Sequence, residues 1–155
     1  MKIKLISTIA AVASLLFWSN ALAEDQAVLV KAVLTTHTYN DKDNDTGVFV
    51  DVTKADGTDL IAKCANADNS KDKSTEYKKN SDHAVNLEIL VTGIKKSACK
   101  GFKVHMWQHT SGWETWRFKP SVILTFSDGA TLVAEGGNVE LKNDKAATDF
   151  SAPGQ

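Results

Sequence analysis

The sequence lacks several features that would identify large classes of protein. It has no apolar run as long as the roughly 20 residues that a membrane-spanning helix needs, since its most apolar stretch is Leu5 to Trp18. It has no excess of basic charge, because 18 Lys and Arg face 19 Asp and Glu. Nucleic-acid binders carry a concentrated basic patch. The charge balance therefore argues against nucleic acid, and also against plain electrostatic attraction to anionic lipid.

The first 23 residues have the organisation of a cleaved export signal. Lys2 and Lys4 precede the apolar stretch, and Ala21-Leu22-Ala23 forms a small-x-small cleavage site before Glu24. No cysteine follows that site, which argues against a lipid-anchored lipoprotein. We therefore expect residues 1–23 to be removed and the mature chain to be exported, to the periplasm or the extracellular space, without a transmembrane segment. Loss of the two lysines would take the formal net charge from −1 to −3.

Cysteine is scarce, with Cys64 and Cys99 the two in the chain. Two cysteines in an exported chain most simply form one disulfide. The bridge would close a loop of about 35 residues and contribute about 3–4 kcal/mol in the chain-entropy model. A catalytic thiol is the competing interpretation, and the bridge is the better one.

Sustained helical periodicity is also missing, and apolar residues instead alternate with period two. Strands are predicted at 27–38, 47–53, 59–65, 84–91, 101–109 and 138–142, with a hairpin over 121–135 that turns at Asp128-Gly129. About seven or eight short strands indicate an all-β fold, an antiparallel β-sandwich or barrel, and we predict the sandwich. Residues 24–143 would form this single domain, with a long exposed loop over 66–82 and a loosely ordered tail over 144–155.

Two motifs raise the question of a metal. His105 and His109 on one strand would have backbones about 13 Å apart, too far for one zinc ion. Asp41, Asp43 and Asp45 repeat the start of a calcium loop, but Thr46 and Val52 stand where an EF-hand needs Gly and Glu. Three carboxylates on a turn between strands are still a calcium candidate. A solvated acidic turn is the alternative.

Aromatic residues gather in "KVHMWQHTSGWETWRF", residues 103–118, which holds three of the four tryptophans. Trp116 has the parity of Phe118 and leads into a strand, so core packing is favoured for it. Trp107 and Trp113 fit packing or binding equally, because an exposed indole offers a large apolar surface to a partner. The predicted ligand- or partner-binding residues are Trp107, His109, Trp113, Trp116 and Arg117.

Catalytic motifs are missing: the sequence has no G-x-S-x-G, no HExxH and no phosphate-binding glycine loop. We therefore predict that the protein is not an enzyme. A small glycan-acting hydrolase would need two paired carboxylates, and the candidates are Asp51 with Glu88 or with Glu114.

Two segments resemble the PLAT/LH2 domain family. "TGVFVDVTKADGT" looks like its second-strand signature, and "FKVHMWQHTSGWETWRFKPSVILTFSDGATL" is similar to a later segment with a strand, a polar turn, a Trp and two more strands. The resemblance covers roughly residues 28–135. It implies an eight-stranded β-sandwich that docks non-catalytically onto membranes or proteins, with calcium at Asp41, Asp43 and Asp45 and Trp113 at the lipid. The charged insertion 66–82 and the Cys64–Cys99 pair depart from the family pattern.

The first functional hypothesis is an exported, non-catalytic binding module that docks to lipid or a protein through exposed tryptophans, with calcium bridging the acidic turn to anionic headgroups. The alternative is a periplasmic inhibitor or immunity-type protein that binds a secreted enzyme or toxin. Small size and a mixed aromatic and charged surface suit such a protein interface.

Overall fold

The computed structural model describes residues 26–40, 42, 46–65, 67, 77–110, 113 and 115–154. The predicted export signal lies outside these residues, so its cleavage and the exported location remain predictions. No helix within the described ranges is both long and apolar enough to cross a membrane.

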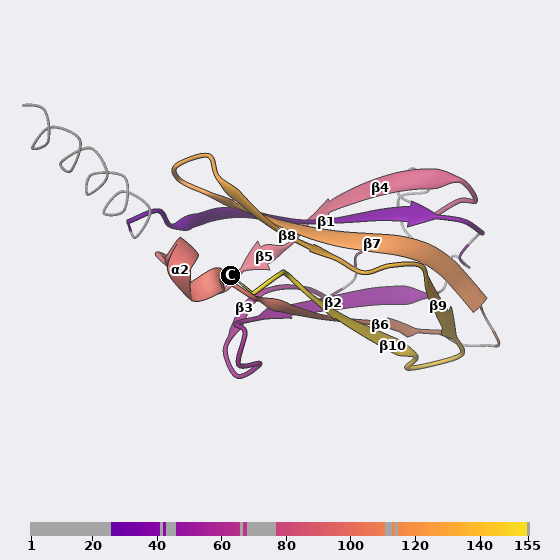
Figure 1. Ribbon diagram of the computed structural model, residues 1–155. Helices are drawn as coiled ribbons and strands as arrows, with labels where there is room; N and C mark the ends of the chain where they lie inside the picture. The colour runs from indigo at the N-terminus through magenta and orange to yellow at the C-terminus, as the bar shows by residue number, and fades with distance from the viewer. Residues whose placement is uncertain are drawn as a thin grey trace, which may run out of the picture.

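The described residues form ten strands in two five-stranded antiparallel sheets (Figure 1). Sheet I contains β1 (Leu29–Thr38), β4 (Ser81–Asn86), β7 (Thr115–Phe126), β8 (Thr131–Glu135) and β9 (Val139–Lys142). Its order is β4-β1-β7-β8, and β9 pairs with the first half of β7. Sheet II contains β2 (Gly47–Thr53), β3 (Leu60–Cys64), β5 (Glu88–Ile89), β6 (Lys103–His109) and β10 (Ala147–Ser151), in the order β10-β6-β2-β3-β5. The predicted all-β sandwich is confirmed, with ten strands in the described residues in place of the seven or eight predicted.

The core lies between the sheets because alternate residues of each strand face inward. In sheet II the inner face includes Val50 and Met106, and in sheet I it includes Leu34 and Leu124, all fully buried. The predicted hairpin joins β7 to β8 at Asp128-Gly129. Gly129 has φ of 82°, which favours glycine, and the Asp128 carboxylate accepts a hydrogen bond from the Ala130 amide (2.9 Å).

Two of the connections that pass from one sheet to the other lie at the sides of the sandwich. The strand predicted over 84–91 is divided at Leu87, whose amide donates to the Ala32 carbonyl (2.9 Å) and whose side chain is buried. β4 before it belongs to sheet I and β5 after it to sheet II. On the other side, the chain leaves β9 in sheet I and enters β10 in sheet II.

The C-terminal segment corrects the prediction of a loosely ordered tail over 144–155. Residues Ala147–Ser151 form β10, which pairs with β6 along its whole length. Phe150 packs against the core, and Asp149 bonds to His105 opposite it (2.7 Å). "ATDFS" is too short and too polar for its alternation to stand out, so the strand depends on its partner β6.

The predicted disulfide is wrong: Cys64 and Cys99 are free thiols that are not at disulfide distance. Cys64 ends β3 and lies opposite Val50 in the middle of β2. Cys99 ends the short helix α2 (Lys96–Cys99), where it interacts electrostatically with Lys54 beyond the last residue of β2. The two cysteines therefore lie at different positions along the length of β2, one beside its middle and one near its end, which keeps them apart.

Four chain connections meet at one end of the sandwich, which we call the loop end. β1 and β6 finish there and β2, β4 and β7 begin there, as their pairings require. The described loop residues at this end include Tyr39, Asn40, Thr110, Trp113 and the β9–β10 turn at 143–146. In Figure 1 the loop end lies on the right, at the tip of β1.

Candidate functional site

The structure separates the three tryptophans of residues 103–118. Trp116 is an inner-face residue of β7 with no exposed surface. Its indole stacks on Phe118 with ring centroids 3.7 Å apart and packs edge-on against Tyr77 at 5.1 Å. Trp116 is therefore a core residue, and its inclusion among the partner-binding residues is corrected. The parity that it shares with Phe118 is the physical reason.

Trp107 lies on the outer face of sheet II and is half-buried. Its ring stacks on Phe49, the residue opposite on β2, with centroids 5.3 Å apart and planes inclined by 13°. His105, two residues earlier on the same strand, packs against the indole at 5.2 Å. Much of the Trp107 indole surface is thus already covered by the Phe49 and His105 rings.

Trp113 has 93% of its surface exposed, far more than any other large apolar side chain that the structure describes. It lies at the loop end, between the last residue of β6 and the first of β7. An indole carries a large apolar area, and solvated exposure of that area is unfavourable unless a partner covers it.

The two polar residues of the predicted site lie on opposite faces of the sandwich. His109 is at the end of β6 on sheet II, where Nδ1 contacts the Asp144 carboxylate (2.6 Å). Arg117 is on the outer face of sheet I, where Nε donates to Glu140 (2.5 Å). The five predicted partner-binding residues therefore do not form one surface. Alternation along β6 and β7, together with the turn between them, distributes them over two faces, the core and the loop end.

Two carboxylates near this end have lowered pKa values. Burial acts to raise the pKa of Asp144, but hydrogen bonds from the Thr110 amide and from His109 outweigh it, and the pKa falls below 3.8. The pKa of Glu140 falls below 4.5 because Lys142 and Arg117 both donate hydrogen bonds to it. Both groups are therefore anionic at neutral pH. The bonds of Asp144 stabilise the β9–β10 turn, and those of Glu140 stabilise β9 against β7.

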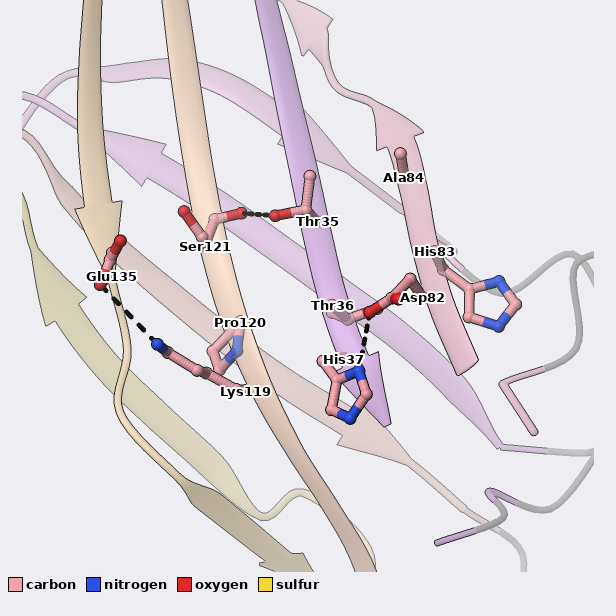
Figure 2. Close-up of a pocket in the computed structure, with 10 residues that line it drawn as sticks. All are labelled: Thr35, Thr36, His37, Asp82, His83, Ala84, Lys119, Pro120, Ser121 and Glu135. Atoms are coloured by element: carbon pink, nitrogen blue, oxygen red, sulfur yellow. Dashed lines mark hydrogen bonds and ion pairs between the residues drawn. The ribbon is translucent and has the colours of Figure 1, made fainter. Parts of the chain in front are cut away.

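A groove on the outer face of sheet I was not predicted from the sequence (Figure 2). It is an open hollow of about 450 Å³ that crosses β4, β1, β7 and β8. His37 Nδ1 contacts the Asp82 carboxylate at one side (2.7 Å), and Lys119 lies 3.9 Å from Glu135 at the other. Between these pairs the side chains are short.

The register of sheet I explains the shape of this groove. Ala84, Thr35, Ser121 and Glu135 lie in one row across the four strands, and Asp82, His37 and Lys119 lie in the next. Three short side chains in the first row leave a depression beside the longer ones of the second. Thr35 Oγ1 donates to the Ser121 carbonyl at the floor (3.4 Å). No local motif could have revealed the site, because its residues come from four separate strands.

A second hollow, of about 380 Å³, adjoins the groove toward the loop end. Tyr39, Arg117, Asn138 and Glu140 line it. The Tyr39 hydroxyl donates to the Asn138 side-chain oxygen (3.1 Å), and the ring packs edge-on against His37 with centroids 4.9 Å apart. His37 and Tyr39 therefore connect the two hollows.

The His37–Asp82 pair has the form of an oriented imidazole, as general bases do. Nucleophilic catalysis would also require a hydroxyl or thiol within hydrogen-bond reach of the ring. Within the described ranges, no hydrogen bond joins His37 to such a group. The absence of enzymatic activity remains a prediction.

Asp51 and Glu88, two of the three carboxylates considered for a hydrolase, lie on the outer face of sheet II. Asp51 pairs with Lys63 across β2 and β3, and Lys63 pairs with Glu88 across β3 and β5. The lysine thus separates the two carboxylates. Glu114 lies outside the described residues.

The predicted calcium ligands Asp41, Asp43 and Asp45 all lie outside the described residues, so the calcium site remains a prediction. In the part of the chain that the structure covers, no group of three or more His, Cys, Asp or Glu is arranged to hold a metal ion.

Comparison with known proteins found no matching family model, no matching curated protein and no matching solved structure. The resemblance to PLAT/LH2 domains therefore depends on the two sequence segments alone.

Proposed function

We propose that this protein is a non-catalytic binding module that docks onto a lipid surface through Trp113. The observation that carries the proposal is the 93% exposure of the Trp113 side chain at the loop end of a closed sandwich. Indole rings favour the interface between the lipid headgroups and the hydrocarbon, because the ring is apolar and its N–H needs a polar partner.

The loop end is the only part of the predicted tryptophan surface that still supports docking. Trp116 is inside the core and Trp107 is covered in part by Phe49, so neither competes with Trp113 as an anchor. Docking through one protruding ring does not depend on net positive charge. The proposal includes calcium as a bridge between the acidic turn at Asp41, Asp43 and Asp45 and anionic headgroups.

Co-sedimentation of the mature protein with vesicles tests this proposal. Zwitterionic vesicles and vesicles with anionic lipid are each used with calcium and with a chelator. We expect binding in at least one condition, with Trp113→Ala weakening it about tenfold or more, because the substitution removes most of the inserted apolar area. Trp107→Ala is the matched control, which removes an indole from a different face and should leave binding unchanged.

Brominated lipids add a direct readout, since they quench only an indole that enters the bilayer. Quenching that Trp113→Phe abolishes would support insertion of this ring. Absence of binding in all four conditions would exclude the lipid surface. A stable equimolar complex with an exported protein that Trp113→Ala disrupts would instead favour the inhibitor or immunity-type alternative, in which the ring is a contact at the centre of a protein interface.

A further inference from the structure

We infer that the two adjoining hollows on the outer face of sheet I form one groove that binds a neutral saccharide. This inference does not depend on lipid docking, because it concerns a different face of the sandwich and different residues. The hollows measure about 450 and 380 Å³, and sites for small ligands are typically about 300–1,000 Å³.

Each carboxylate of the groove has a polar partner, which is an imidazole for Asp82 and a cation for Glu135 and for Glu140. Asp82 contacts His37 at 2.7 Å, Glu135 lies 3.9 Å from Lys119, and Glu140 accepts from Arg117 at 2.5 Å. A phosphate or carboxylate ligand would have to approach three carboxylates, and a cationic ligand would meet Lys119 and Arg117. The surface is therefore complementary to a ligand that carries no net charge.

Paired charged groups still offer hydrogen bonds, since each carboxylate has about four acceptor positions and Arg has five donors. Lys119, Arg117, Asn138 and the carboxylates thus present donors and acceptors at fixed positions, because each is held by a partner. Neighbouring hydroxyls of a sugar ring are donors and acceptors at once. They match such an array better than a ligand with few polar groups does.

Tyr39 supplies the apolar surface that a sugar also requires. Its side chain is 38% exposed, and its ring is held from two sides by Asn138 and His37. The C–H groups on one face of a pyranose pack favourably against the face of an aromatic ring. Thr35 and Ser121 add short hydroxyl-bearing side chains at the floor of the neighbouring hollow, where a second sugar unit would lie.

An extended peptide is a poorer match to this location. Peptides recognised through their backbone add to the edge of a sheet, where N–H and C=O groups are free. The groove crosses the face of four paired strands, and the two strands in its middle, β1 and β7, are hydrogen-bonded to a neighbour on each side. Recognition here must come from side chains, as it does for saccharides.

Titration of isotopically labelled mature protein, followed by amide chemical shifts, tests the inference. The probes are cellohexaose, maltohexaose and chitohexaose, with a uronic-acid hexamer as the anionic comparison and a soluble decapeptide of neutral composition. We expect saturable shifts from at least one neutral hexamer, with a dissociation constant below about 1 mM, at residues 35–39, 82–84, 117–121 and 135–140. The anionic hexamer and the peptide should bind more weakly.

Substitutions locate the ring contact. Tyr39→Ala should weaken binding about twofold to twelvefold, since a ring contact contributes about 0.5–1.5 kcal/mol. Tyr39→Phe keeps the ring and loses the bond to Asn138, and it should retain most of the affinity. Retained affinity in this variant would show that the weaker binding of Tyr39→Ala comes from loss of the ring and not from a disturbed fold. Lys63→Ala on the outer face of sheet II is the control and should have no effect. No saturable shift with any neutral hexamer, shifts on sheet II, or tighter binding of the uronate or the peptide would overturn the inference.

Discussion

Phe49 on β2 and Trp107 on β6 lie directly opposite each other on the outer face of sheet II, and their rings stack with centroids 5.3 Å apart. This contact joins two central strands of the sheet from the solvent side. It gives Trp107 a structural role that Trp113, only six residues later, does not have. The difference leads to a direct comparison of the two residues.

Trp107→Ala should lower the free energy of unfolding by about 1–3 kcal/mol, because it removes a half-buried ring and a cross-strand pair. Trp113→Ala should change it by no more than about 0.5 kcal/mol, as expected for a surface residue without packed neighbours. Urea denaturation of the two variants measures both values. Equal destabilisation by the two substitutions would contradict the separation of roles described above.

Gly136 lies where the edge of sheet I meets β10. A Cβ added there would be 2.9 Å from both the Phe150 ring and the Pro120 ring, closer than real contacts allow. Gly136→Ala should therefore destabilise the protein by about 1–3 kcal/mol. Gly137→Ala is the matched control, since nothing lies within 4 Å of its added Cβ. Thermal melting of both variants tests the prediction, and equal melting temperatures would refute the close approach of β10.

The two cysteines should behave as free thiols of different reactivity. Burial raises the pKa of the Cys99 thiol to about 11, so almost none of the reactive thiolate is present at neutral pH. Cys64 is partly exposed and should react first with Ellman's reagent. Cys64→Ser should leave only the slow phase, and denatured protein should release both thiols at once.

Mass spectrometry of the unreduced protein provides the contrary outcome for the cysteines. A gain of two hydrogens on reduction would demonstrate a disulfide. Such a bond would require Cys64 and Cys99 to lie closer together than they do in the folded structure.

Stability should fall in acid, partly through Glu140. Its pKa in the folded protein is below the ordinary 4.5 because Lys142 and Arg117 donate hydrogen bonds to it. The unfolded chain therefore binds this proton more readily, so the contribution of Glu140 is present above the ordinary pKa and is lost as the pH falls through the folded one. Asp128 and Asp144, whose pKa values are also lowered, act in the same direction.

Melting temperatures between neutral pH and about pH 3 measure this dependence. Glu140→Gln should make the loss of stability in acid smaller, because the variant has no proton to bind at this position. Lys142→Ala, which removes the largest cause of the lowered pKa, should have the same effect. If the melting temperature of both variants fell with pH as steeply as that of the unaltered protein, a contribution of Glu140 to acid sensitivity would be excluded.

Much of the strand content was readable from the sequence because alternation is a local property. The inward parity of Val48, Val50 and Val52 and the turn at Asp128-Gly129 each depend on a few neighbouring residues, and the structure has them as predicted. The break at Leu87 and the strand β10 were missed. Both depend on a partner segment far away in the chain, Ala32 for the first and β6 for the second.

The candidate sites divide in the same way. The sequence by itself indicated an all-β sandwich and favoured core packing for Trp116, because side-chain parity follows from the backbone repeat of a strand. Only the tertiary structure decided that the tryptophan cluster is not one surface and that His37, Asp82, Lys119 and Glu135 share a groove. Residues nearly a hundred positions apart become neighbours through strand order and register, and no local pattern encodes either.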